Sequence, residues 1–90
     1  MQLHVVVRGR VQGVGFRWFV REEARRLDLA GWVQNRPDGA VEVAADGAEA
    51  SIHALRRALE AGPQGANVTS VDEIDTGSSA SLHRPFTILR

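Results

Sequence analysis

The sequence contains neither cysteine nor lysine, and each absence removes a class of chemistry. Without cysteine, the chain has no disulfide, no thiolate ligand for a metal and no cysteine nucleophile. Without lysine, it has no residue for Schiff-base catalysis. The sequence also lacks an apolar run long enough to cross a bilayer and a leader resembling a signal peptide. We therefore expect a cytoplasmic protein that does not associate with a membrane.

Acidic and basic residues are balanced at eleven each, so the formal net charge at pH 7 is zero. This balance argues against a nucleic-acid-binding module, which presents a basic surface. The distribution is less even, because the first 36 residues hold most of the arginines and few acids. Arg21, Arg25 and Arg26 are either ordinary charges on a helix surface or part of a local positive field that favours a small anion.

The first half of the chain predicts a strand over residues 2–9, a helix over residues 16–29 and a hairpin over residues 31–46. Apolar residues in the helical segment recur at spacings of three and four, which is typical of one buried stripe. Gly31 stands where glycine usually closes a helix. Residues 32–36 read as the first strand of the hairpin, and Pro37-Asp38-Gly39 is a strong turn signal.

The second half predicts a helix, a strand and a short apolar run at the end. Asp46 and Glu49 have the spacing of a capping box, and Gly62-Pro63 stops the helix that they would open. The core side of this helix is formed by Ile52, Leu55 and Leu59. The next strand contains the apolar residues Val68, Val71 and Ile74, and the last apolar run covers residues 86–89. A serine-rich segment over 77–81 separates the last two.

The resulting order is β-α-β-β-α-β with a short extra strand at the C-terminus. It predicts the α+β class and a ferredoxin-like split βαβ fold, with an antiparallel sheet and two helices on one face. Ninety residues that are 43% hydrophobic suffice for one modest core, so we assign residues 1–90 to a single domain.

A glycine-containing loop connects the first predicted strand to the first predicted helix. Gly13 and Gly15 allow successive backbone N–H groups to turn toward a ligand. The start of the helix at about Phe16 adds unpaired N–H donors. Arg17 then places a guanidinium that can bind two phosphate oxygens. This pattern predicts an anion site, although the glycines alone fit a tight turn, and Trp18 breaks the dinucleotide fingerprint.

Two segments, residues 9–17 (GRVQGVGFR) and 31–39 (GWVQNRPDG), resemble the two signatures of the acylphosphatase family, in the same order and spacing. The resemblance implies hydrolysis of acyl phosphates, which are carboxylic–phosphoric mixed anhydrides, to a carboxylate and inorganic phosphate. It implies that Arg17 binds the phosphate, that Asn35 positions the attacking water, and that no metal or organic cofactor is needed. The loop amides that would hold the phosphate oxygens belong to Gln12, Gly13, Val14, Gly15 and Phe16.

The residues themselves favour direct attack by water at phosphorus. Cysteine-dependent phosphatases place a cysteine six positions before the arginine of their phosphate loop, and here that position is Val11. A phosphoenzyme is therefore not expected. Asn35 is too weak a base to deprotonate water, but its amide can orient a water molecule. Positioning and charge stabilisation are the main catalytic demands of such phosphoryl transfer.

The chief alternative is a non-catalytic ferredoxin-like module that binds a small anion or regulates a partner. An RNA-binding module is disfavoured by the zero net charge and the lack of an aromatic motif for stacking bases. His4, His53 and His83 show no metal-ligand spacing, so no metal site is expected. We expect a monomer that is inhibited competitively by phosphate, and nothing in the sequence identifies the acyl group.

Overall fold

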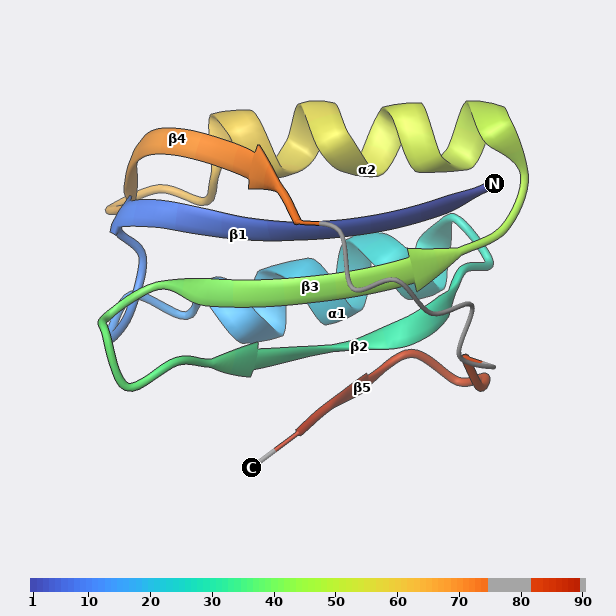
Figure 1. Cartoon of the computed structure of the whole chain (residues 1–90), viewed down its shortest axis with the longest axis horizontal. Helices are drawn as coiled ribbons and strands as arrows, with labels where there is room; N and C mark the ends of the chain where they lie inside the picture. The colour runs from blue at the N-terminus through green and yellow to red at the C-terminus, as the bar shows by residue number, and fades with distance from the viewer. Residues whose placement is uncertain (75–81, 90) are drawn as a thin grey trace.

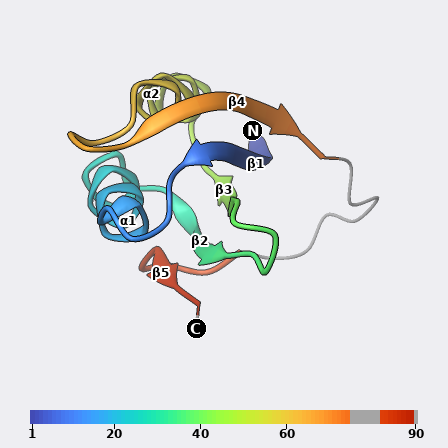
Figure 2. The same cartoon turned by 90° about the vertical axis from the view of Figure 1, so that its left-hand side faces the viewer.

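The described residues form two layers, a five-stranded sheet with both helices packed on one of its faces (Figures 1 and 2). The computed structural model describes residues 1–74 and 82–89. Its elements, in chain order, are β1 (Gln2–Arg10), α1 (Phe16–Arg26), β2 (Ala30–Asn35), β3 (Val41–Asp46), α2 (Glu49–Ala61), β4 (Asn67–Glu73) and β5 (Thr87–Ile88). The predicted α+β class, element order and short last strand are confirmed.

The strands lie in the order β4-β1-β3-β2-β5. All neighbours are antiparallel except β2 and β5, which run parallel with Trp32 opposite Thr87. The sheet is therefore mixed, where the sequence predicts a wholly antiparallel one. The reason is the entry point of the last segment: the Gly31 N–H donates to the His83 carbonyl at 3.0 Å, so this segment reaches the sheet where β2 begins and follows β2 in the same direction.

A single apolar core lies between the sheet and the helices. Alternate residues of β1 point toward the helices, as the pleat of a strand requires, and β1 is paired on both sides. Phe16, the first residue of α1, is 1% exposed, so its burial fixes the point at which the loop becomes helix. The core residues are Leu3, Val5 and Val7 of β1, Phe16, Val20 and Ala24 of α1, and Ile52, Leu55 and Leu59 of α2.

Helix α1 ends at Arg26, three residues earlier than predicted, and Gly31 does not close it. Asp28 takes the left-handed conformation, with φ 57°, that glycine usually supplies after a helix. The Asp28 N–H donates to the Arg25 carbonyl at 3.1 Å, and the Leu29 N–H to the Ala24 carbonyl at 2.9 Å. These two bonds form a Schellman motif, which ends the helix.

Gly31 instead lies inside β2, with φ +137°. A Cβ at this position would lie 1.9 Å from the backbone oxygen of Ala44 on β3. Glycine is needed here because the two backbones approach too closely for any side chain. The prediction that Gly31 closes the first helix was therefore wrong.

Helix α2 also starts differently from the prediction. Its N-cap is Ala48, no side chain caps it, and Asp46 is the last residue of β3. The Asp46 carboxylate lies 3.7 Å from the N-terminal ammonium of Met1, so this charge pairs with the chain terminus and not with the helix. The capping box predicted for Asp46 and Glu49 was wrong.

The remaining elements lie close to their predicted places. β2 begins at Ala30, two residues before its predicted start, and β4 ends at Glu73, one residue before Ile74. The turn at Pro37-Asp38-Gly39 connects β2 to β3 as predicted. The serine-rich segment 77–81 lies outside the described residues. Among the described helices, none is long and apolar enough to cross a membrane.

Candidate active site

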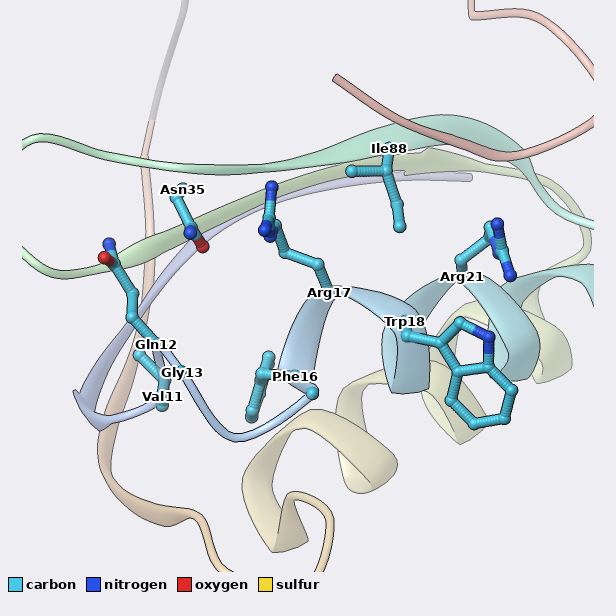
Figure 3. Close-up of a pocket in the computed structure, with 10 residues that line it drawn as sticks. Val11, Gln12, Gly13, Phe16, Arg17, Trp18, Arg21, Asn35 and Ile88 are labelled. Atoms are coloured by element: carbon cyan, nitrogen blue, oxygen red, sulfur yellow. The ribbon is translucent and has the colours of Figure 1, made fainter. Parts of the chain in front are cut away.

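A hollow of about 260 Å³ lies where the loop after β1, the first turns of α1, the end of β2 and β5 meet (Figure 3). Its walls therefore come from segments that are far apart in the sequence, and the sheet topology brings them together. The residues that line it are Val11, Gln12, Gly13, Gly15, Phe16, Arg17, Trp18, Arg21, Asn35 and Ile88.

The loop of residues 12–16, here called the anion-binding loop, forms one wall. Gly13 and Gly15 both have φ +75°, and a Cβ built at either position would meet nothing within 4 Å. Glycine is therefore favoured here by backbone conformation and not by lack of space. Gly15 is also the N-cap of α1; no side chain of the described residues caps this helix, and its first turn contains no acidic residue. The first N–H groups of α1 thus have no side-chain acceptor, which suits an anion.

Arg17 and Asn35 face the same hollow from two different elements. Arg17 lies in the first turn of α1 and extends toward Asn35, the last residue of β2, whose amide points into the hollow (Figure 3). Within residues 1–74 and 82–89, neither side chain has a hydrogen bond or an ion pair. Both groups are therefore available to a ligand, and the structure brings these two predicted residues together.

Gln12 ties the anion-binding loop to the hairpin that carries Asn35. Its side-chain Nε2 donates to the backbone carbonyls of Arg36 and Ala40, both at 2.9 Å. Arg36 directly follows Asn35, and its N–H donates to the Ala40 carbonyl at 2.8 Å to close the turn. One side-chain amide thus fixes the loop relative to the end of β2. From the sequence, only the backbone N–H of Gln12 was predicted to contribute to the site.

Asp38 stabilises this turn from outside the hollow. Its carboxylate accepts the Ala40 N–H at 3.1 Å and lies 3.3 Å from Nη1 of Arg8. The hydrogen bond from the Ala40 backbone lowers the pKa of Asp38, and Arg8 and Arg36 lower it further. Asp38 does not line the hollow, which agrees with its prediction as a turn residue.

Glu42 holds a polar cluster on the face of the sheet that the helices leave uncovered. One carboxylate oxygen lies 2.6 Å from Nε2 of His4, and the other accepts a hydrogen bond from Gln34 at 3.2 Å. Burial raises the pKa of Glu42, but the hydrogen bonds from His4 and Gln34, with the charges of His4 and Arg36, lower it below its ordinary value. The cluster supports β1, β2 and β3 behind the site.

Four residues line the hollow that were not among the predicted site residues, namely Val11, Trp18, Arg21 and Ile88. Val14, of which only the backbone amide was predicted to contribute, packs its side chain against the core. Arg21 was already considered as part of a local positive field, and it lies four residues after Arg17 and so on the same face of the helix. Ile88 had no sequence signal, since its place depends on the parallel pairing of β5 with β2.

The chemistry of the lining is cationic and amide-rich. None of the residues that line the hollow is a serine, threonine, cysteine, histidine, aspartate or glutamate. The hollow as described therefore holds no side chain of the usual nucleophilic types and no carboxylate that would repel an anion. In the described ranges, 1–74 and 82–89, no group of three or more histidine, cysteine, aspartate or glutamate residues is placed to hold a metal ion.

Comparison with known proteins agrees with this geometry. The family model for acylphosphatase matches residues 3–88. The chain belongs to the acylphosphatase family. It is 46% identical over 88 residues to an acylphosphatase of Bacillus velezensis, covering 98% of this chain and 97% of the relative. It is 56% identical over 70 residues to an acylphosphatase of Pseudomonas paraeruginosa, covering 78% and 77%.

The fold comparison gives the same answer. The crystal structure of acylphosphatase from Bacillus subtilis matches with a TM-score of 0.89 and 43% identity, over 99% of this chain and 98% of that one. The predicted family and the predicted activity, acylphosphatase, are thereby confirmed. An acyl phosphate is the substrate that membership of this family implies.

Proposed function

We propose that the anion-binding loop and Arg17 bind the phosphoryl group of an acyl phosphate while Asn35 holds the water that attacks phosphorus. One observation supports this division above all others. An arginine without an acidic partner among the described residues, an amide side chain and an uncapped helix start share one hollow with no carboxylate in its lining. In the reaction, the P–O bond to the acyl group breaks, and the products are a carboxylate and inorganic phosphate.

Binding comes first. The phosphoryl oxygens replace the missing cap of α1 by accepting N–H groups of the anion-binding loop, and the guanidinium of Arg17 binds two of them side by side. Charge builds on the equatorial oxygens in the transition state, so the contact with Arg17 becomes stronger as the reaction proceeds. The residue thus contributes to rate as well as to affinity.

The leaving group needs no proton from the enzyme. A carboxylic acid ionises at a pKa of about 4, so the acyl group departs as a stable carboxylate at neutral pH. The lining of the hollow contains no general acid, which agrees with this chemistry. Likewise, Asn35 orients water by donating and accepting hydrogen bonds, and the proton of that water passes to a phosphate oxygen of the substrate.

Hydrolysis of benzoyl phosphate by three variants tests these roles. Arg17→Gln should lower kcat/KM by about 100- to 1000-fold or more, the usual cost of losing one preorganised donor. Asn35→Ala should lower kcat but leave competitive inhibition by phosphate largely intact, because Asn35 contacts water. Arg26→Gln is the matched control: its side chain is 67% exposed, pairs with Glu23 at 2.6 Å and does not line the hollow.

The outcomes separate binding from catalysis. Wild-type turnover should persist with a chelator. An Arg17→Gln variant that keeps both phosphate affinity and turnover would place the phosphoryl group elsewhere. Tight phosphate binding by the wild type without any turnover would favour a non-catalytic anion-binding module. We further propose that the chain acts as a monomeric single domain, residues 1–90, in the cytoplasm; its lack of cysteine fits a reducing compartment.

A further inference from the structure

The hollow contains two arginines, and only one is needed for the phosphoryl group. Arg17 and Arg21 both line it, and no carboxylate does. They are four residues apart on α1, so they share one helix face and are separated by about 6 Å along the axis. Arg17 extends toward Asn35, whereas Arg21 lies near Trp18, on the other side of Ile88 in Figure 3. Arg21 therefore lies farther from Asn35 than Arg17 does, on the far side of the proposed phosphoryl site (Figure 3).

The free protein has no structural reason to keep these two charges together. Like charges four residues apart destabilise a helix, and cations near a helix start oppose its dipole. Arg21 has one partner among the described residues, its neighbour Glu22, whose Oε2 lies 3.1 Å from Nε. The Arg21 side chain is 29% exposed and that of Glu22 45% exposed, and such surface pairs are weak. Neither terminal nitrogen of Arg21 has a hydrogen-bond partner among the described residues.

We propose that Arg21 binds a second negative charge on the substrate, so that the enzyme prefers acyl phosphates whose acyl group ends in a carboxylate. This inference rests on the proposed function of Arg17 and names the substrate class for the same site. Trp18, which is 58% exposed, and Ile88 also line the hollow and supply apolar surface for the carbon chain. An aliphatic acyl group that lies on this surface carries its terminal carboxylate away from the phosphoryl group and toward Arg21.

A matched pair of substrates isolates the second charge. Succinyl phosphate and butyryl phosphate have acyl chains of the same length, and only the first ends in a carboxylate. The ratio of their kcat/KM values should favour succinyl phosphate in the wild type. Arg21→Gln keeps a side chain of similar reach without the charge, and it should lower this ratio about tenfold. Arg26→Gln, on the outer surface of the same helix, should leave the ratio at its wild-type value.

Two further measurements exclude a merely structural effect. The wild-type ratio should fall as ionic strength rises, because the contact between Arg21 and the carboxylate is screened. Trp18→Ala should lower kcat/KM for both substrates and leave the ratio unchanged, since it removes apolar contact to the shared chain. A ratio that is the same in wild type and Arg21→Gln would overturn the inference.

The experiment also distinguishes this inference from the proposed function. If Arg17→Gln abolishes turnover of both substrates while Arg21→Gln leaves their ratio unchanged, the phosphoryl site stands and the acyl-side contact is wrong. If Arg17→Gln retains turnover of both, the phosphoryl site itself is wrong. A ratio below one in the wild type would mean that Arg21 does not attract the acyl carboxylate at all.

Discussion

Replacement of Gln12 by methionine should weaken both the fold and the catalytic site. The substitution keeps the approximate length of the side chain and removes its two hydrogen bonds, to the carbonyls of Arg36 and Ala40. A net value of about 1 kcal/mol for each bond predicts a loss of about 2 kcal/mol in the free energy of unfolding. For a domain of this size, the midpoint of thermal unfolding should fall by about 10 °C.

The catalytic effect should be larger than the loss of stability suggests. These bonds hold the anion-binding loop against the turn that follows Asn35, so on the proposed roles of the loop and Asn35 their loss shifts the phosphoryl group relative to the attacking water. A displacement of about 1 Å can cost about 100-fold in rate. Because the backbone N–H groups still bind phosphate, kcat should fall more than the affinity for inorganic phosphate.

Chemical denaturation, hydrolysis of benzoyl phosphate and competitive inhibition by phosphate test this reasoning together. Gln34→Met is the matched control, since it removes one side-chain amide bond, to Glu42 at 3.2 Å, away from the hollow. This control should lose about 1 kcal/mol of stability with unchanged kcat. A Gln12→Met variant that is destabilised to the expected extent but keeps wild-type kcat would show that the two hydrogen bonds of Gln12 stabilise the fold without contributing to catalysis. A Gln12→Met variant with the same free energy of unfolding as the wild type would show that the two hydrogen bonds do not stabilise the fold.

Three other perturbations have defined outcomes. Gly31→Ala should destabilise the fold by about 3 kcal/mol in urea unfolding, because the new Cβ meets the Ala44 oxygen and φ is positive. Glu42→Gln should lower the free energy of unfolding by about 1 kcal/mol at pH 7. Because the folded pKa of Glu42 lies below its ordinary value, the wild type keeps this advantage in stability above about pH 4.5 and loses it on further acidification. Phosphate at 100 times its dissociation constant should stabilise the wild type by about 2.7 kcal/mol in a thermal shift assay, and Arg17→Gln should abolish this shift.

The elements that could be predicted from the sequence are those fixed by local patterns. The valines of β1 and the stripe through Phe16 and Val20 specify a strand and a helix by their periods of two and three to four. The turn at Asp38 follows from local turn chemistry. The two signatures then indicated Arg17 and Asn35 together, which no local pattern could have done.

Failures of prediction occurred where a distant segment decides a residue's role. Gly31 looked like the end of a helix, but β3 approaches it too closely for a side chain. Asp46 looked like a cap, but it pairs with the N-terminal ammonium at 3.7 Å. Asp28 closes α1 in a left-handed conformation that glycine usually takes. The short last strand was predicted, but its parallel pairing with β2, which places Ile88 at the hollow, has no local signal in the sequence.

The two ends of α1 differ in how the chain compensates the helix dipole. At its last turn, Arg25 and Arg26 complement the helix dipole, and Nε of Arg25 donates to the Phe86 carbonyl at 2.8 Å. That bond holds the segment leading into β5 and thereby places Ile88 at the hollow. At its first turn, the same helix has no side-chain cap and no acidic residue, and it carries Arg17. Burial of Phe16 holds this uncompensated start in place, and on the proposed function the phosphoryl group supplies the acceptor that the side chains of the described residues do not.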